Sequence, residues 1–491
     1  MGIEITRESF DGADHARFAA RLTDQLAALR AVLARPGFGA GPASLGSEVE
    51  VSIVDGAGRP LGVNRAVLAS TLDRRVTLEV DRFNLELNTR PCALAGTPFA
   101  ALARELEDGL AELRRAAATY GGRVVTIGIL PTLMAEDLGS AALTDSARYR
   151  ALSAAIRGLR HEPFPIRIGG DDPLRLDADD VTLQGANTSF QIHLRVAPAD
   201  FARSYNAAQI ATGPALAAAG NSPLFLGHRL WEETRVAVFR QSVDERVDAE
   251  PDDWRAARVS FGHGWVRQGA YELFAESVAL HPVFLPVCAE ASPASAGIPS
   301  LLELRLHHGT VWRWNRAVYD DVGGGHLRIE MRALPCGPTV ADMTANAGFL
   351  VGLTLGIAPH VDELLPRFTF GQARRNFYAA ARDGLAAELL WPSARTPSPE
   401  PHAAHALVAA LLPVARAGLV DNGVDPAEAD AHLGVIAARV ARRATGARWQ
   451  RQALERLRTG RTGSEALAAL LERYLAAAAT GRPVHEWERI L

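Results

Sequence analysis

The sequence predicts an α+β fold, in which a largely antiparallel, polar-faced sheet is flanked by helices and followed by a helical C-terminal region. Short segments with alternating apolar and polar residues are interleaved with long helical patterns, and from about residue 340 onward the patterns are mostly helical. Hairpin-like strands with one polar face, mixed with helices, are typical of an α+β domain. We divide the chain into residues 1–360, which hold the strands, and a helical region, 361–491.

Start and stop signals predict the helices. Residues 14–35 form an amphipathic pattern that ends at Pro36. Thr97 and Pro98 begin another helix, because proline is favoured at the first helical position. Further helices are predicted over residues 145–159, over 198–221 with a break near Gly213 and Pro214, and within 224–244. Residues 123–131 are predicted to form a buried strand, and residues 243–300 an irregular segment.

Five segments that are predicted as strands share one pattern. Each has an apolar face, and its opposite face carries carboxylate, imidazole or guanidinium groups. Glu48 and Glu50 are two residues apart, so both side chains project from the same face of a strand. The corresponding polar residues of the other segments are Glu86 and Asn88; Ser189, Gln191, His193 and Arg195; Glu303, Arg305 and His307; and Arg328, Glu330 and Arg332. A solvated face is the ordinary explanation for one such strand. Glutamate is depleted in strands, however, so a shared binding surface explains the set better.

Clustered glutamates repel one another, and a hard cation relieves that repulsion. We therefore predict a Mg²⁺ site, open also to Mn²⁺, whose carboxylate ligands are Glu48, Glu50, Glu86 and Glu330. His193 is predicted as a further ligand or a phosphate contact, with a hydrogen-bonded core histidine as the alternative.

Arg332 follows Glu330 by two residues on the same predicted face. This spacing lets a metal ligand and a guanidinium meet one phosphoryl group, as phosphoryl transfer requires. A plain salt bridge between Arg332 and a neighbouring glutamate is the alternative.

Composition excludes several classes of protein and of site. The 491 residues carry a net charge of −4, which gives no support to a nucleic-acid partner. The charged N-terminus does not resemble a secretory signal, and we expect no apolar run of membrane-spanning length. Three scattered cysteines fit a reduced, cytoplasmic protein.

The chain contains no lysine, so all 52 of its basic residues are arginine. A phosphate-binding loop of the GxxxxGK[ST] type and a Schiff-base lysine are therefore excluded. If the protein handles phosphate, arginine and metal ions must supply the positive charge.

The ordered motifs GSEVE, ELNTRP, NTSFQIHLRV, NSPLFLGHRLWEETRVAVFRQSVD and HLRIEMRALPCGPT resemble the glutamate–cysteine ligase family. The resemblance covers about residues 40–360. Within the family, the motifs more specifically resemble the bacterial carboxylate–amine ligase branch, whose catalytic fold is related to glutamine synthetase. It implies a ligase over residues 1–360 that uses ATP to convert an amino-acid carboxylate into an acyl phosphate, which an amine then attacks. The role of residues 361–491 is left open.

The resemblance also implies roles for individual residues. The strand glutamates and His193 would hold two or three Mg²⁺ ions, with Glu50 and Arg332 as catalytic residues. Arg328 and Arg332 would contact ATP. Arg235, Asn88 and Gln191 would bind the amino-acid substrate. The alternative for Arg235 is a helix-surface residue that pairs with Glu232 or Glu233.

The expected partners are small molecules, an amino acid such as glutamate and an amine, with no nucleic acid and no membrane. The identity of the amine and the oligomeric state, a homo-oligomer included, are left open. Two other functions remain as alternatives: a metal-dependent hydrolase of amides or phosphoesters, and a ligase-derived scaffold without catalysis.

Overall fold

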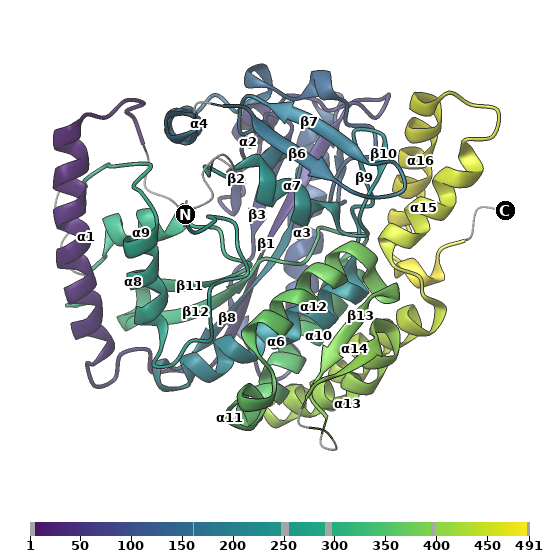
Figure 1. Ribbon diagram of the computed structural model, residues 1–491. Helices are drawn as coiled ribbons and strands as arrows, with labels where there is room; N and C mark the ends of the chain where they lie inside the picture. Colours follow the sequence, from purple (N-terminus) through teal and green to yellow (C-terminus); the bar gives the residue numbers. More distant parts are fainter. Residues whose placement is uncertain are drawn as a thin grey trace.

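The computed structural model describes residues 5–160, 162–246, 255–289, 297–393, 396 and 398–488. Within these residues an eight-stranded antiparallel sheet runs through the molecule, and helices surround it (Figure 1). Six strands follow the order β11-β12-β8-β1-β3-β2, while β4 and β5 also pair with the long β1. Their bounds are β1 Ser44–Val54, β2 Val76–Leu78, β3 Asn84–Asn88, β4 Cys92–Ala93, β5 Arg123–Val125, β8 Phe190–Val196, β11 Asn315–Asp320 and β12 His326–Met331. The predicted α+β class with a polar-faced antiparallel sheet is confirmed.

The other elements are mostly helices, with three small two-stranded sheets among the described residues. The helices are α1 Gly12–Leu33, α2 Asn64–Ser70, α3 Pro98–Ala118, α4 Ala147–Leu159, α5 Thr182–Gly185, α6 Phe201–Ala219, α7 Thr234–Ser242, α8 Ala270–Leu280, α9 Leu302–Gly309, α10 Val340–Ile357, α11 Val361–Leu364, α12 Phe370–Asp383, α13 Ala404–Asp421, α14 Pro426–Arg442, α15 Gly446–Leu457 and α16 Gly463–Ala478. The small sheets pair β6 Phe164–Ile168 with β7 Leu174–Ala178, β9 Leu224–Phe225 with β10 His228–Arg229, and β13 Glu388–Trp391 with β14 Glu400–Ala403.

Most predicted helices are confirmed, but the predicted break in α6 is wrong. This helix continues through Gly213 and Pro214 to Ala219. Proline removes one backbone hydrogen bond from a helix interior. Every residue of α6 from Ser204 onward is buried, and α6 packs against α10 and α12, so tertiary packing outweighs that loss.

Two loop-or-strand predictions are only partly right. Residues 124–131 are buried and Arg123 is partly exposed, but the strand β5 ends at Val125. The segment 243–300 contains α8, and its residues 247–254 and 290–296 lie outside the described part of the chain.

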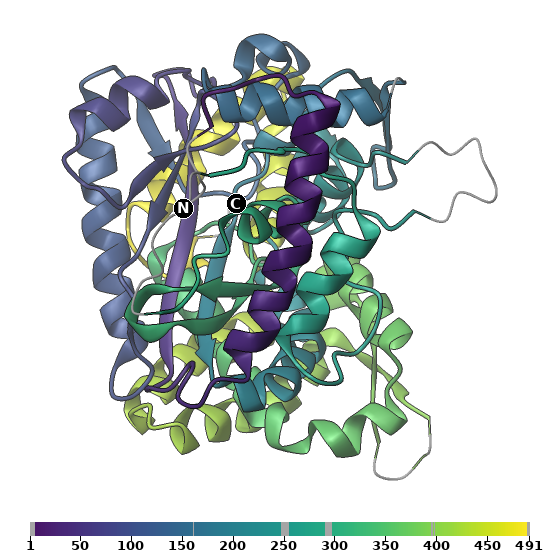
Figure 2. The same ribbon diagram turned by 90° about the vertical axis from the view of Figure 1, so that its left-hand side faces the viewer.

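The segment with Glu303, Arg305 and His307 was predicted as a strand, and this prediction is wrong. It forms the helix α9, which packs against α1 and α8 beside the edge strand β11 of the sheet. Leucine, glutamate and arginine all favour helices, and an eight-residue segment is short enough for its apolar positions to fit either period. Figure 2 shows α1 crossing in front of this part of the molecule.

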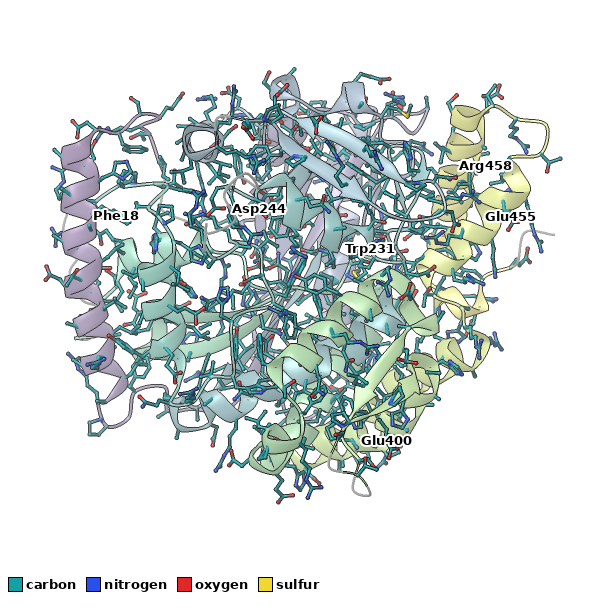
Figure 3. The ribbon with its side chains drawn as sticks, in the orientation of Figure 1. Phe18, Trp231, Asp244, Glu400, Glu455 and Arg458 are labelled. Carbon is teal, nitrogen blue, oxygen red and sulfur yellow. The ribbon has the colours of Figure 1, made fainter. Side chains whose placement is uncertain are left out.

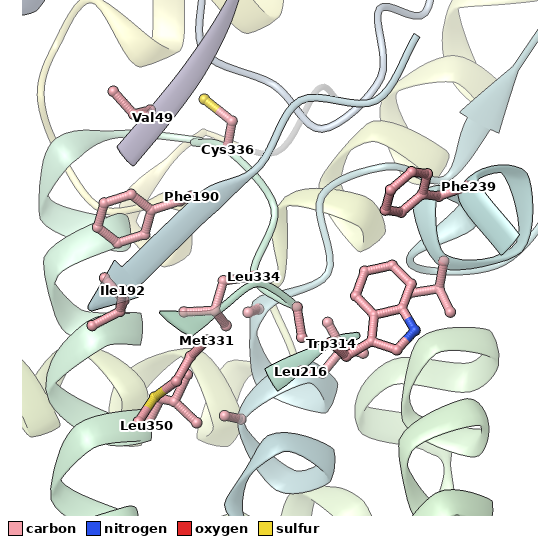
Figure 4. Packing of buried hydrophobic residues seen from close by; sticks show 14 of the residues in the cluster. Val49, Phe190, Ile192, Leu216, Phe239, Trp314, Met331, Leu334, Cys336 and Leu350 are labelled. Atoms are coloured by element: carbon pink, nitrogen blue, oxygen red, sulfur yellow. The ribbon is translucent and has the colours of Figure 1, made fainter. Parts of the chain in front are cut away.

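The apolar face of the sheet forms the core beside the polar face. Val49 on β1 and Phe190 and Ile192 on β8 are fully buried. Figure 4 shows Phe190 and Ile192 projecting from the same side of β8, with Met331 and Leu350 beside Ile192. Helices α6 and α10 contact β8 or β12 on this side. Burial of these side chains fixes the register, because a slip of one residue would move the apolar set to the opposite face.

The C-terminal helices share this core. Helices α13 and α14 pack on α10, and Arg439 on α14 forms a buried ion pair with Asp342 on α10 at 2.8 Å. Glu455 on α15 and Arg458, directly after this helix, lie on the opposite side of the molecule from Phe18 on α1 (Figure 3). The division of the chain at residue 360 stays a prediction.

Among the described residues, two helical segments have the length and hydropathy to cross a membrane, although we expected no apolar run of that length. They are Val340–Arg367 and Ala404–Asp421, both of mean hydropathy 1.4. The most apolar window of the first is 78% buried inside the protein, since α6, α13 and α14 pack around α10. A buried core helix passes the same test of length and composition.

Candidate active site

The strand register brings polar residues from four strands to one face of the sheet. Glu50 on β1 lies opposite Glu86 on β3, and Glu330 on β12 lies opposite His193 on β8. Glu48, two residues before Glu50, projects from the same face. The structure thus places the five residues that were predicted as metal ligands on one surface, while their metal-binding role stays a prediction.

In the part of the chain that the structure describes, two groups of side chains could hold a cation, and Glu48, His193 and Glu330 form the first. His193 Nε2 lies 3.0 Å from Glu48 Oε1 and 3.9 Å from Glu330 Oε1. Burial acts to raise the pKa of Glu48, but the adjacent His193 outweighs it and the pKa is lowered. Burial also opposes ionisation of Glu330, yet Arg316, Arg332 and His193 together hold its pKa well below the usual range. Both carboxylates are therefore charged at neutral pH.

Glu50, Glu79 and Glu86 form the second group, whose ligand atoms lie within 4.8 Å of one another. Burial, with repulsion from Glu48 and Glu50, raises the pKa of Glu86 to about 8. Burial and the neighbouring carboxylates also raise the pKa of Glu79 well above its ordinary value. Burial raises the pKa of Glu50 despite the nearby arginines.

These two groups fit divalent magnesium or manganese. Carboxylate oxygens are the ligands that Mg²⁺ prefers, and one imidazole nitrogen beside them suits Mn²⁺ as well. The pKa values of the second group are raised because carboxylates of like charge lie close together where water is largely excluded. A bound cation would relieve this repulsion.

Sequence reasoning missed Glu79. It follows directly after β2, and Thr77 of that strand lies opposite Glu86 and donates a hydrogen bond to its Oε1 at 3.1 Å. Thr77 and Glu79 share one face, which the alternation Val-Thr-Leu-Glu could have indicated. A strand of three residues gives too little of that pattern to stand out.

Arg332 connects the two groups. Its Nη1 lies 3.2 Å from Glu330 Oε1 and donates to Gln191 Oε1 at 2.7 Å. Gln191 Nε2 in turn donates to Glu50 Oε1 at 3.1 Å. The other oxygen of Glu50 accepts from the backbone N–H of Ser189 at 2.7 Å. The predicted salt bridge of Arg332 to a glutamate exists, and it belongs to a network that spans both candidate metal groups.

Arg316 is a second residue that sequence reasoning missed. It lies on β11 opposite Glu330, and its Nη2 donates to Glu330 Oε1 at 2.8 Å. The alternation in NRAVYD places Arg316, Val318 and Asp320 on one face. Two charged residues on either side of a valine are the only sequence signal for this site residue.

Arg235 is the second residue of α7 and is buried, with 3% of its side chain exposed. Its Nε donates to Glu233 Oε1 at 2.8 Å, and its Nη2 donates to the carbonyl of Ala333 at 2.7 Å. The pairing with Glu233 agrees with the alternative for this residue, but its position does not, because Arg235 lies inside the protein. It lines one cavity together with Glu50 and Arg332.

Asn88 and Arg328 lie on the same face but are engaged with protein groups. Asn88 Nδ2 donates to Glu86 Oε1 at 2.7 Å. Arg328 Nη1 donates to Asp320 Oδ2 at 2.8 Å and lies 3.1 Å from His326 Nε2. Their proposed contacts with substrate and ATP stay predictions.

The family model described as glutamate–cysteine ligase family 2 (GCS2) matches residues 44–472. No curated protein sequence matches the chain.

Solved structures show weaker likeness. A glutamate–cysteine ligase from Francisella tularensis in complex with AMP aligns with a TM-score of 0.49 at 11% identity, over 92% of this chain and 90% of that chain. A bifunctional glutathione synthetase from Pasteurella multocida aligns with a TM-score of 0.44 at 12% identity, over 95% of this chain and 55% of that chain. The ligase PafA, solved in complex with the prokaryotic ubiquitin-like protein Pup, aligns with a TM-score of 0.38 at 11% identity, over 87% of this chain and 72% of that chain.

Proposed function

The chain belongs to glutamate–cysteine ligase family 2, and from this membership we propose that it is an ATP- and Mg²⁺-dependent ligase that joins an amino-acid carboxylate to an amine. Glutamate is the proposed acid, linked through its γ-carboxylate. The observation that carries the proposal is the position of Arg332, which contacts Glu330 of one carboxylate group and reaches Glu50 of the other through Gln191.

The proposed reaction has two steps. A carboxylate oxygen of the acid attacks the γ-phosphorus of ATP, the bond to the bridging oxygen breaks, and ADP leaves. The amine nitrogen then attacks the acyl carbon, the bond from that carbon to the phosphate oxygen breaks, and phosphate and a proton are released. The product is an amide.

The chain's own residues serve these steps by position and charge. Glu48, His193 and Glu330 would hold one Mg²⁺ or Mn²⁺ ion and the second group another, which would supply positive charge to the phosphates. Arg332 stabilises the negative charge of the transferring phosphoryl group. Gln191 and Glu330 fix the orientation of its guanidinium.

Arg235 is the proposed contact for the substrate carboxylate. It shares the cavity with Glu50 and Arg332, and its backbone-anchored guanidinium is already oriented. Arg328 would extend the positive surface toward ATP, and Asn88 and Gln191 would contact the amino acid at the edges of the carboxylate groups. We place this activity in residues 1–360, and we propose a cytoplasmic location.

One assay set tests the function. ADP release should require Mg²⁺, the acid and an amine together. With ¹⁸O in the acid's carboxylate, one labelled oxygen should appear in the released phosphate. Hydroxylamine in place of the amine should trap the acyl phosphate as a hydroxamate. Turnover of an amide or phosphoester without ATP would instead favour the hydrolase, and the absence of nucleotide binding with Mg²⁺ present would refute the ligase.

A further inference from the structure

The helices α15 and α16, which we call the C-terminal helix pair, contact the segment that follows α6 (Figure 1). The backbone N–H of Ala447 on α15 donates to the carbonyl of Gly220 at 2.8 Å. Gln450 Nε2, three residues further along α15, donates to Asn221 Oδ1 at 2.9 Å and to the Asn221 carbonyl at 3.1 Å. On α16, the Tyr474 hydroxyl accepts from Asn221 Nδ2 at 2.9 Å. Both helices therefore converge on one residue, Asn221.

The contacts around Asn221 are shielded from water. Asn221, Gln450 and Tyr474 are fully buried. Asn221 Nδ2 also donates to the carbonyl of Cys336 at 2.8 Å, so both polar atoms of its side chain are engaged. A buried polar group that loses its partner is costly, so these bonds hold Asn221 in one position.

A glycine allows α15 to come this close to Asn221. Gly446 is the first residue of α15, and a Cβ atom at this position would lie 2.1 Å from Asn221 Oδ1 and 2.8 Å from Pro338 Cγ. Both distances are too short for a real contact, so any side chain here would displace Asn221. Gly463 begins α16 in the same way, after a threonine cap, but a Cβ there would meet no atom of another described part of the chain within 4 Å.

Asn221 is in turn connected to Arg235. The backbone N–H of Asn221 donates to Glu233 Oε2 at 2.9 Å, and Glu233 Oε1 accepts from Arg235 Nε at 2.8 Å. Glu233 and Arg235 are buried, so water screens this ion pair little. The direction in which the Arg235 guanidinium points therefore depends on where Asn221 lies.

The remaining nitrogen of Arg235 is available to a ligand. Its Nη2 donates to the carbonyl of Ala333 at 2.7 Å, while Nη1 has no hydrogen-bond partner among the described residues. Arg235 also lines the cavity beside Glu50. A guanidinium held at two nitrogens can present the third to a carboxylate with little loss of side-chain freedom.

The C-terminal helix pair has further anchors that do not involve Asn221. The rings of Trp449, Tyr474 and Trp487 pack edge to face, with centroids 5.1 to 6.1 Å apart. Arg451 on α15 pairs with Glu232 at 3.0 Å. These contacts hold the pair in place, so a change at its junction with Asn221 alters the junction and leaves the helices docked.

We propose that the C-terminal helix pair belongs to the acid-binding site, and that Gln450 and Asn221 are positioning residues for Arg235. The pair acts through Asn221 and Glu233 on the guanidinium that receives the substrate carboxylate. This inference rests on the proposed ligase function, since it concerns the contact of Arg235 with the acid. It gives a role to part of residues 361–491.

The matched substitutions Gly446→Ala and Gly463→Ala test this role in the full-length protein. Alanine is favoured over glycine in helices, so neither change weakens its own helix. Hydroxamate formation from Mg-ATP, glutamate and hydroxylamine is the readout. Gly446→Ala should raise the KM for glutamate about ten-fold, because a displaced Asn221 misdirects Arg235. Gly463→Ala should keep the wild-type KM.

The other kinetic constants distinguish positioning from general damage to the fold. In Gly446→Ala, kcat at saturating glutamate and the KM values for Mg-ATP and hydroxylamine should stay within about two-fold of wild type, as expected when only a binding contact is lost. A decrease in kcat with no selective change in the KM for glutamate would overturn the inference.

A second variant removes hydrogen bonds instead of adding volume. Gln450→Met deletes both donations to Asn221 at similar side-chain size, and it should raise the KM for glutamate about three-fold or more. Gln452→Met, at an exposed position on α15, is the matched control. Circular dichroism establishes that each variant is folded at the assay temperature, and Gln450→Met decides if Gly446→Ala does not fold.

The wild-type protein separates the two proposals. If it forms no hydroxamate with glutamate, the ligase function is refuted and this inference with it. If the wild type forms hydroxamate and the folded variants keep its KM for glutamate, only the role of the helix pair is refuted.

Discussion

Arg332 Nη1 on β12 donates to Gln191 Oε1 on β8 at 2.7 Å, so a guanidinium and an amide from neighbouring strands are joined over the polar face. Through Gln191 the contact extends to Glu50 on β1. A charge-assisted hydrogen bond of this kind both holds the arginine and sets the direction in which its free N–H groups point. The orientation of Arg332 is thus a property of three strands together.

Replacement of Arg332 by alanine should lower kcat for ADP release by about 10³-fold or more, because an arginine that stabilises a transferring phosphoryl group contributes on that scale. Single-turnover kinetics with Mg-ATP and glutamate measures the effect on the chemical step. Arg175→Ala, at an exposed position on β7, is the matched control. A kcat within a few-fold of wild type in Arg332→Ala would remove this residue from the reaction.

Replacement of Glu79 by glutamine should weaken cation binding at the second carboxylate group. We expect the Kd for Mn²⁺, followed by calorimetry, to rise about ten-fold or more. Without metal the variant should unfold at a higher temperature than wild type, because burial raises the pKa of Glu79 and ionisation of this residue in the unfolded chain no longer opposes folding. Glu107→Gln on the exposed side of α3 serves as control. Identical Mn²⁺ binding by wild type and Glu79→Gln would show that Glu79 is not a ligand.

Acid should destabilise the folded protein through two buried histidines. Burial lowers the pKa of His281 to about 3 and that of His307 to about 4. The unfolded chain binds protons at both sites near pH 6.5, so the free energy of unfolding should fall as the pH drops from about 6.5 toward 4. Each histidine accounts for at most about 1.4 kcal/mol per pH unit.

Urea midpoints between pH 4.5 and 7 measure this slope. The double variant His281→Gln and His307→Gln should flatten it, whereas His15→Gln, at an exposed position on α1, should leave it unchanged. A double variant with the wild-type slope would assign the acid sensitivity to other groups.

Loss of the Tyr474 hydroxyl should destabilise the link between the C-terminal helices and the site. This hydroxyl donates to the carbonyl of Thr126 and accepts from Asn221 Nδ2, both at 2.9 Å. The backbone N–H of Asn221 donates to Glu233, the ion-pair partner of Arg235. Tyr474→Phe should lower the free energy of unfolding by about 1–3 kcal/mol, since the buried Thr126 carbonyl and one N–H of the Asn221 amide each lose a hydrogen bond.

The same variant should raise the KM for the acid substrate, because Arg235 loses part of its support. Tyr120→Phe at an exposed position is the control. If Tyr474→Phe lowers stability but leaves that KM unchanged, the C-terminal helices support the fold without influencing the site.

The sequence alone places Glu48, Glu50, Glu86, His193 and Glu330 correctly on one face, because the alternation of side chains along a strand is a local property. Which strands are neighbours depends on long-range packing, so the contact of Glu330 with His193 could not be derived from spacing. Only the ordered resemblance to a known family linked these segments beforehand.

The failures have equally local causes. Helix propensity overrode the strand-like alternation around Glu303 in α9. Glu79 sits at the end of a three-residue strand, and Arg316 is the only charged residue of its alternating run that faces Glu330. Arg235 is buried because of the way α7 packs against the rest of the protein. The helical pattern of the sequence predicts the helix but not which of its polar residues are buried.

The positive charges around the candidate site come from Arg235, Arg316 and Arg332, and the chain contains no lysine. A guanidinium stays protonated, so it does not act as a nucleophile at neutral pH. An acyl phosphate formed there would therefore meet no side-chain amine of its own protein. Such a ligase can hold an activated acid while it waits for the second substrate, without modifying itself.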